Sequence, residues 1–327
     1  MNALVTGGTG FVGGHLVDAL LARGERVTAL VRSPSRAAPL EARGVRLVRG
    51  DLHDLRALAD ATAGQNVIYH VAGLIAARSE AEFLHGNRDG TENLVAATVG
   101  SGGHASSPPR FIMVSSLAAV GPAAPGAPVR GDPPARPVTQ YGRSKLAAEA
   151  VVRRAAIPWT IVRPPTVYGP RDHEVLKVFK LARLGLGPVF GDGAQELSAV
   201  FAPDLAEALI AAAHAPTAVG RVYYACHPEI FTARAFVRAV GRSLDRTVVT
   251  LRIPRMAGRV ALAVTDLAAR LMGQATVLTA DKANEFFQPA WTCDPDELQR
   301  DAGWRAAHDL EAGLAATARW YRDAGWL

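Results

Sequence analysis

The motif TGGTGFVG at residues 6–13 is the sequence feature that most constrains the fold of this chain. It places Gly7, Gly10 and Gly13 directly after a short apolar run and directly before a helix-forming stretch. Glycines at this spacing permit a tight turn, a close approach of the backbone to a pyrophosphate, and close packing of the helix on the strand. The start of the helix then offers N–H groups and a favourable dipole to phosphates. The motif therefore predicts a dinucleotide-binding loop between a strand and a helix.

Short apolar strands alternate with helical segments through the first half of the chain. The expected strands occupy residues 3–7, 26–32, 45–52, 66–73, 110–116 and 159–165. They read as continuous runs of Val, Ile and Leu, which is typical of a parallel sheet covered by helices on both faces. The sequence therefore predicts an α/β fold with a doubly wound, mostly parallel sheet (a Rossmann fold) and a smaller, mainly helical C-terminal substrate region. We expect residues 1–170 to form the dinucleotide-binding domain and residues 171–327 the substrate-binding region, with a strand near 221–226 that returns to the first domain.

Composition narrows the classes of function. The formal net charge is +6, but the arginines are scattered and only four of the 36 basic residues are lysine, so no nucleic-acid footprint is expected. The two cysteines, Cys226 and Cys293, form neither a C-x-x-C motif nor a disulfide framework, which is typical of a reducing compartment. No charged-then-apolar leader is visible at the N-terminus. We therefore expect a cytoplasmic protein.

The stretch at 255–272 is the most apolar helical segment of the C-terminal half. Arg259, Asp266 and Arg270 interrupt it, so it is too polar to span a bilayer and no membrane insertion is expected. Its pattern favours a packed amphipathic helix over a contact with a membrane.

The end of the second expected strand indicates which dinucleotide binds. An acidic residue there would hold the ribose 2′-OH of NAD, but this chain has Arg32, Ser33 and Arg36 instead. An arginine can hydrogen-bond a 2′-phosphate and neutralise its charge. We therefore predict a preference for NADP(H), with NAD(H) as the alternative. The competing interpretation is that Arg32 is one more surface arginine in an arginine-rich protein.

A second group of residues carries acid–base chemistry. Tyr141 and Lys145 are four residues apart on an expected helix and so share one face. A phenol has a pKa of about 10, and a cation one turn away favours its ionised form. Ser115 and Ser116 end an expected strand, where side chains of a doubly wound sheet face the ligand crevice. A serine hydroxyl there could hold a carbonyl oxygen while Tyr141 supplies the proton.

With these motifs the chain resembles the extended short-chain dehydrogenase/reductases, which include the NAD-dependent epimerase/dehydratase and the dihydroflavonol reductase/3β-hydroxysteroid dehydrogenase groups. The resemblance covers residues 3 to about 205 with specific motifs. It implies that Tyr141 is the general acid/base, that Lys145 lowers the pKa of Tyr141 and holds the nicotinamide ribose, and that Ser116, rather than Ser115, orients the substrate oxygen. It also implies hydride transfer at the nicotinamide and a small-molecule substrate, and it is compatible with a homodimer.

The resemblance also implies the positions of the cofactor and substrate contacts. In the glycine loop these are Thr6, Gly7, Gly10, Phe11, Val12 and Gly13, joined at the second strand by Arg32, Ser33 and Arg36. Farther along the chain they are Asp51, Leu52, Val71, Ala72, Gly73, Asn87, Lys145, Pro164 and Pro165. The expected substrate contacts are Ser116, Thr166 and Val167. No metal site is expected.

Two departures from the family patterns bear on the substrate. Dehydratases of this kind carry an Asp-Glu pair after the active-site hydroxyl, where this chain has Leu117 and Ala118. Sugar-nucleotide enzymes usually clamp the substrate diphosphate with an arginine where this chain has Leu197. A diphosphate without that clamp would lose charge-assisted hydrogen bonds worth about 1.5–3 kcal/mol each. Other arginines that could compensate are Arg163, Arg171 and Arg252.

The sequence therefore favours an NAD(P)-dependent reductase or dehydrogenase that acts on a ketone, an aldehyde or a secondary alcohol. A sugar-nucleotide epimerase is the alternative. A non-catalytic NADP-binding sensor is a third hypothesis, against which the Ser116, Tyr141 and Lys145 set argues.

Overall fold

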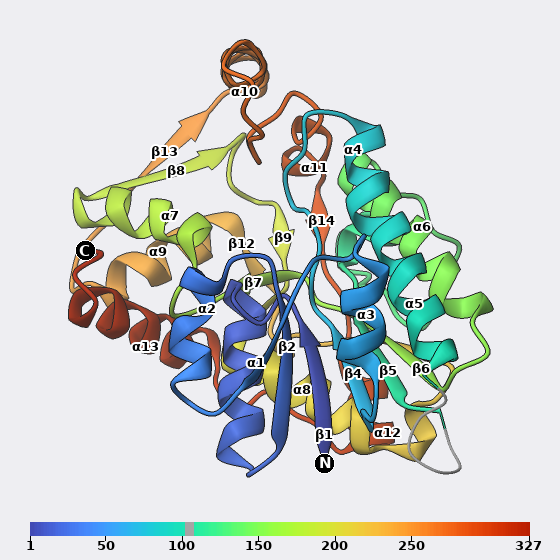
Figure 1. Cartoon of the computed structure of the whole chain (residues 1–327). Coiled ribbons are helices and arrows are strands. Elements are labelled where there is room, and N and C mark those ends of the chain that lie inside the picture. The colour runs from blue at the N-terminus through green and yellow to red at the C-terminus, as the bar shows by residue number, and fades with distance from the viewer. Residues whose placement is uncertain (102–107) are drawn as a thin grey trace.

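The computed structural model describes residues 1–101 and 108–327, and within them every side chain except those of Pro34 and Arg36. A sheet of seven parallel strands forms the centre of the molecule, in the order β11-β6-β5-β4-β1-β2-β3 (Figure 1). Its strands are β1 (Asn2–Thr6), β2 (Arg26–Val31), β3 (Arg46–Arg49), β4 (Val67–His70), β5 (Arg110–Val114), β6 (Trp159–Arg163) and β11 (Arg221–Tyr224). The predicted doubly wound parallel sheet is thereby confirmed.

Helices cover both faces of this sheet and build the C-terminal part of the chain. In the first half they are α1 (Phe11–Ala22), α2 (Pro34–Glu41), α3 (Leu55–Thr62), α4 (Glu80–Leu84), α5 (Gly90–Gly100) and α6 (Gln140–Arg154), with a π-helical turn over His85–Asp89 and a 3-10 turn over Leu117–Ala119. In the second half they are α7 (His173–Arg183), α8 (Ala202–His214), α9 (Ala233–Ser243), α10 (Arg255–Leu271), α11 (Ala283–Phe286), α12 (Asp296–Ala302) and α13 (Leu310–Asp323), with a 3-10 turn over Pro216–Ala218. Among the described residues, no helix combines the length and the apolar character needed to cross a membrane.

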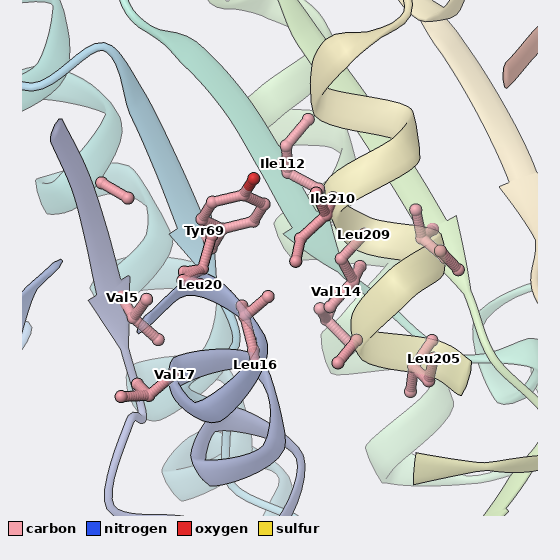
Figure 2. Packing of buried hydrophobic residues seen from close by; sticks show 14 of the residues in the cluster. Val5, Leu16, Val17, Leu20, Tyr69, Ile112, Val114, Leu205, Leu209 and Ile210 are labelled. Carbon is pink, nitrogen blue, oxygen red and sulfur yellow. The ribbon is translucent and has the colours of Figure 1, made fainter. Parts of the chain in front are cut away.

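Alternating side chains of the strands explain the two covered faces. On one face, Val5 of β1 packs with Leu16 and Leu20 of α1 and with Leu209 of α8 (Figure 2). Leu4, the neighbour of Val5, points to the other face and joins a cluster built with α3, α5 and α6. Both faces of the strands are therefore apolar, which is why the strands read as continuous apolar runs in the sequence.

The C-terminal region contains more strand than the sequence predicts. Helices α7, α9 and α13 do enclose a cluster of their own, with Phe179, Val240, Leu314 and Tyr321 in it. Beside them lie three small sheets, which pair β7 with β10, β9 with β12 and β14, and β8 with β13. Their bounds are β7 (Thr166–Tyr168), β8 (Leu186–Phe190), β9 (Glu196–Leu197), β10 (Ala199–Phe201), β12 (Phe231–Thr232), β13 (Val249–Ile253) and β14 (Ala290–Trp291). Five of these strands, all except β8 and β13, have only two or three residues and are too short to show a period, so tertiary pairing alone reveals them.

One later strand belongs to the large sheet. β11 pairs in parallel with β6 and forms the edge of the sheet, although about 60 residues separate the two strands. The intervening chain supplies β7 to β10 together with α7 and α8. The division of the chain at residue 170 stays a prediction.

Candidate active site

The glycine loop joins β1 to α1 in a turn that has no room for side chains. Gly7 has a φ of +75°, and a Cβ there would lie 2.8 Å from the backbone nitrogen of Ala72. A Cβ on Gly13 would lie 2.1 Å from the carbonyl oxygen of Gly7, which also accepts a hydrogen bond of 2.9 Å from the Gly10 N–H. The loop conformation therefore requires glycine at positions 7 and 13.

The first turn of α1 is open to an anion. Helix α1 begins after Gly10, and within the described part of the chain no side chain caps its N-terminus and no acidic residue lies in its first turn. The N–H groups and the positive end of the helix dipole thus face the glycine loop without a competing carboxylate. This arrangement fits the pyrophosphate of a dinucleotide. The next residues, Phe11 and Val12, are partly buried, the first with its ring 5.8 Å from that of His15.

The backbone after β4 connects the glycine loop to the acid–base residues. The Oγ1 atom of Thr6 accepts a hydrogen bond of 3.2 Å from the Ala72 N–H. One residue on, a Cβ at Gly73 would lie 3.2 Å from Oδ1 of Asn87 and 3.5 Å from Nζ of Lys145. Val71, Ala72 and Gly73 therefore lie between the predicted phosphate site and the predicted catalytic residues.

Asn87 fixes this backbone to helix α6. It is buried in the π-helical turn, where Oδ1 accepts a hydrogen bond of 2.7 Å from the Leu74 N–H. Its Nδ2 donates to the Leu74 carbonyl (3.1 Å) and to Oγ of Ser144 (2.9 Å). Ser144 in turn donates to the carbonyl of Tyr141 (2.7 Å). Sequence reasoning missed Ser144, whose only signal is its place beside Lys145.

Lys145 is buried beneath the site. Its Nζ donates a hydrogen bond of 2.8 Å to the carbonyl oxygen of Val114, at the end of β5. Burial lowers the pKa of Lys145 to about 8, although the nearby Glu149 carboxylate acts in the opposite direction. The ammonium is therefore held by the sheet, next to Gly73.

The two serines after β5 have different surroundings. Ser115 is buried and donates a hydrogen bond of 2.6 Å to Oε1 of Glu149. Its hydroxyl proton is therefore directed to Glu149 and not to the site. Ser116 is partly exposed, and its Oγ accepts a hydrogen bond of 3.1 Å from the Ala118 N–H. Ser116 is also the serine beside Tyr141, where it lowers the pKa of the phenol. The geometry thus supports Ser116 over Ser115 as the substrate-orienting hydroxyl.

The environment of Tyr141 favours its protonated form. Burial raises the pKa of Tyr141 to about 12, against the opposing effect of the hydrogen bond with Ser116, and the carboxylate of Glu285 raises it further. The group that lowers the pKa of this phenol is thus Ser116, whereas Lys145 is bonded to the sheet backbone. At neutral pH the phenol holds its proton. That Lys145 lowers the pKa of Tyr141 stays a prediction.

A segment from the C-terminal region, which carries no recognisable sequence motif, lies over Tyr141. The Gln140 N–H, at the start of α6, donates a hydrogen bond of 2.8 Å to Oδ2 of Asp281. The Nζ of Lys282 lies 5.9 Å from the centre of the Tyr141 ring and binds Oε1 of Glu285 at 2.6 Å. The other carboxylate oxygen of Glu285 is buried and has no hydrogen-bond partner among the described residues. This segment therefore brings a charged pair to the acid–base site.

Two of the three arginines that could replace a diphosphate clamp are already engaged. Arg163 is 1% exposed and binds both carboxylate oxygens of Glu149, at 2.9 and 2.7 Å. Arg171 binds Asp18 of α1 at 2.6 Å. Only Arg252, which is exposed on β13, has neither of these roles.

The clamp position itself is structural. Leu197 pairs with Phe231 and Trp291 in the small sheet of β9, β12 and β14 and packs on a buried cluster with Trp291. Ser198 is buried and accepts a hydrogen bond of 3.2 Å from the Cys293 N–H. Leu197 has no charge with which to replace a cationic clamp, and the neighbouring Ser198 is held by the backbone of Cys293.

The predicted adenosine contacts lie at the ends of β2 and β3. Arg32 is exposed directly after β2, and the neighbouring Ser33 is bonded to Ser35 through their hydroxyls (2.9 Å). The side chain of Arg36 lies outside the described part of the structure. Asp51 is exposed and accepts a hydrogen bond of 2.8 Å from the His53 N–H.

The remaining predicted contacts have packing roles as well. Leu52 lies against Gly90 at the start of α5, where a Cβ would come within 2.9 Å of it. The carbonyl of Pro164 accepts a hydrogen bond of 2.9 Å from the Leu117 N–H, and Pro165 is partly buried. On β7, Thr166 is exposed whereas Val167 packs on the cluster between the sheet, α1 and α8. Their contacts with cofactor and substrate stay predictions.

Among the described residues, no three His, Cys, Asp or Glu side chains lie close enough together to form a group that could hold a metal ion.

Comparisons with known proteins identify the family of this chain. A profile of the NAD dependent epimerase/dehydratase family matches residues 3–226. Ceramide reductase of Caulobacter vibrioides is 33% identical over 325 residues, which are 99% of this chain and 95% of that protein. The 4-hydroxy-2-methyl-3-oxo-4-farnesyl-3,4-dihydroquinoline-1-oxide ketoreductase of Stigmatella aurantiaca is 29% identical, over 97% of this chain and 95% of its own. The solved structure of MoeE5 in complex with UDP-glucose and NAD is 26% identical, with a TM-score of 0.77 and 99% of both chains covered.

The family match spans more than half of the chain, and it includes the glycine loop, Ser116, Tyr141 and Lys145. The chain therefore belongs to the NAD-dependent epimerase/dehydratase family of the extended short-chain dehydrogenase/reductases, whose activity depends on NAD(P) and a small-molecule substrate.

Proposed function

We propose that this protein is an NADP(H)-dependent reductase that converts a ketone or an aldehyde into an alcohol, with Tyr141 as the general acid. The observation that carries the proposal is that Lys145, one helical turn from Tyr141, lies against Gly73 in the backbone that leads directly to the glycine loop, while Ser116 lies beside Tyr141. A proton donor and a dinucleotide site thus share one edge of the sheet.

The reaction follows from the properties of these side chains. When bound, the reduced nicotinamide supplies the hydride that reaches the carbonyl carbon. Ser116 donates a hydrogen bond to the carbonyl oxygen and orients it toward Tyr141. Because the pKa of Tyr141 is raised to about 12, the phenol still carries its proton at neutral pH and gives it to that oxygen as negative charge develops there. Lys145, which donates a hydrogen bond to the Val114 carbonyl, would hold the nicotinamide ribose.

An apolar ketone is the substrate class that we favour. The names of the two reductase relatives refer to a ceramide and to a farnesylated dihydroquinoline oxide. The lack of a diphosphate clamp at Leu197 and the engagement of Arg163 and Arg171 in ion pairs support the same choice. A panel of steroid, flavonoid and aliphatic ketones with nucleotide sugars tests it: we expect NADPH-dependent reduction of an apolar ketone, and turnover confined to nucleotide sugars would contradict the proposal.

A sugar-nucleotide epimerase is the second candidate. It is favoured by the similarity to MoeE5, which was solved with UDP-glucose and NAD. An epimerase regenerates its cofactor in each turnover, whereas a reductase consumes it. Net oxidation of NADPH therefore distinguishes the two activities.

Arg32→Asp is expected to lower the ratio of kcat/KM with NADPH to kcat/KM with NADH. The substitution removes a charge-assisted bond to the 2′-phosphate and adds a repulsive carboxylate, so a change of about tenfold or more is expected. The measurement is the steady-state rate with each cofactor. Arg26→Asp is the matched control, because Arg26 is exposed at the opposite end of β2 and should leave the ratio unchanged. An Arg32→Asp enzyme with the wild-type ratio would contradict the preference for NADP(H).

Substitutions of Glu285 and Ser116 are expected to shift the pH profile in opposite directions. The carboxylate of Glu285 raises the pKa of Tyr141 and the hydrogen bond with Ser116 lowers it. Alcohol oxidation needs the phenolate, so its kcat/KM rises with pH through the pKa of Tyr141. We expect this rise at a lower pH in Glu285→Gln and at a higher pH in Ser116→Ala. Unshifted profiles in both variants would contradict this assignment.

A further inference from the structure

Helix α10 presents an apolar face to solvent. Met256, Val260, Val264, Leu267 and Leu271 recur at intervals of three and four residues, so they form one stripe along the helix. Their exposed fractions range from 58% for Val260 to 80% for Leu271. Figure 1 shows α10 at the top of the view, beyond the tips of β8 and β13 and away from the large sheet. A stripe of this length on an ordinary surface helix marks a contact site.

The opposite face of α10 attaches the helix to the rest of the protein. Gly258, Leu262, Asp266 and Ala269 are its buried residues. A Cβ at Gly258 would lie 2.9 Å from the ring of Phe287 and 3.0 Å from that of Phe190, so the helix sits directly on these rings. The sequence favours a packed amphipathic helix here, but the structure packs only this narrow face. The five-residue stripe points the other way.

The charged residues of α10 indicate what kind of partner surface would bind the apolar stripe. Its one acidic residue, Asp266, is buried and bonded to Arg270 at 3.1 Å. Arg255, Arg259 and Arg270 are exposed, and at 100° per residue Arg259 and Arg270 lie between the buried face and one side of the apolar stripe, whereas Arg255 lies above the buried face at the first residue of the helix. The outward surface of the helix is thus apolar, with arginines along one side of it. An anionic lipid bilayer complements both features, since its acyl boundary takes apolar side chains and its headgroups take arginine.

A second copy of the chain complements this surface less well. A two-fold dimer would place the same surface on itself, which brings exposed arginines and no exposed acidic residue of α10 to the contact. A helix on a bilayer surface also has no need to be long and uncharged enough to span it. The absence of a membrane-spanning helix among the described residues is therefore compatible with an interfacial helix.

We propose that α10 docks the protein on an anionic lipid bilayer, with the five-residue stripe in the acyl boundary and the arginines at the headgroups. The docked helix also leads to the acid–base site. Its Gly258 rests on Phe287, which follows α11, and α11 carries Glu285, whose charge acts on Tyr141. If the proposed reduction of an apolar ketone holds, docking brings the enzyme to the phase in which such a substrate dissolves.

Flotation with vesicles tests the docking without any substrate. The full chain is mixed with vesicles of phosphatidylcholine containing phosphatidylglycerol, or of phosphatidylcholine alone, at low and high salt. We expect the protein to float with the anionic vesicles and to be released by salt, because screening weakens the arginine contacts. The double variant Val260→Glu/Leu267→Glu should lose binding by about tenfold or more, since charges replace apolar side chains at the acyl boundary.

Controls separate docking from folding, from self-association and from the proposed activity. Leu55→Glu changes a residue that is 62% exposed on α3, far from α10 in the fold, and should float like the wild type. The double variant should keep the wild-type melting temperature and the wild-type rate with a water-soluble ketone. The proposal would be overturned if the wild type did not float with anionic vesicles, or if the double variant still bound them. The proposal would also be overturned if light scattering showed that the wild type is a dimer without lipid, that the double variant is a monomer, and that the wild type does not bind vesicles.

Discussion

Tyr141→Phe is expected to lower kcat for carbonyl reduction by about 10²–10⁴-fold while NADPH binding stays near the wild-type value. The substitution removes the group that donates the proton to the carbonyl oxygen in the proposed reaction. The ring itself is kept, so its contacts with Phe83, at 6.1 Å between ring centres, and with the Lys282 ammonium are preserved. The loss should therefore appear in kcat rather than in folding or in the affinity for cofactor.

Steady-state rates and a fluorescence titration with NADPH measure the two quantities separately. Tyr69→Phe is the matched control, because it also removes a buried phenol hydroxyl. Tyr69 lies in the cluster between the sheet, α1 and α8 (Figure 2), and its hydroxyl has no hydrogen-bond partner among the described residues. It should retain the wild-type kcat. A Tyr141→Phe enzyme that kept most of its activity would remove Tyr141 from the mechanism.

Gly13→Ala is expected to weaken NADPH binding by about 100-fold or more, which corresponds to about 2.7 kcal/mol. A Cβ at this position would lie 2.1 Å from the carbonyl oxygen of Gly7, so either the loop or the start of α1 must move. Either movement withdraws N–H groups from the pyrophosphate. The effect is thus steric and acts through the cofactor site.

Gly8→Ala is the control for this prediction within the same loop. The nearest atom to a Cβ at Gly8 is a methyl group of Val17 at 3.4 Å, which is an ordinary contact. Thermal unfolding with and without NADPH compares the variants, since a ligand that binds the folded state raises the melting temperature. We expect NADPH to stabilise the wild type and Gly8→Ala but not Gly13→Ala. Equal stabilisation of all three would contradict the role of Gly13.

The large sheet could be predicted from the sequence because its signals are local. The glycine loop lies between a strand and a helix that adjoin it, and the continuous apolar strands report burial on both faces. The order of the strands follows the general rules for parallel α/β sheets. Tyr141 and Lys145 were placed on one helical face by their spacing alone. Such features need no knowledge of distant contacts.

The covering of the site could not be predicted because it depends on contacts between distant segments. Asp281 and Gln140 are 141 residues apart in the chain, and the hydrogen bond between them brings Lys282 and Glu285 to Tyr141. The bond between Asn87 and Ser144 likewise joins positions 57 residues apart. A periodicity or a motif cannot predict such hydrogen-bonded pairs, since they form only through tertiary packing.

The stoichiometry of NADPH distinguishes a reductase from an epimerase. The wild-type enzyme is incubated with NADPH and the ketone of the panel that it turns over, and NADPH oxidation is followed in parallel with quantification of the alcohol. Reduction predicts one alcohol formed for each NADPH oxidised. Formation of an isomer of the substrate without net loss of NADPH would contradict the account and identify an epimerase instead.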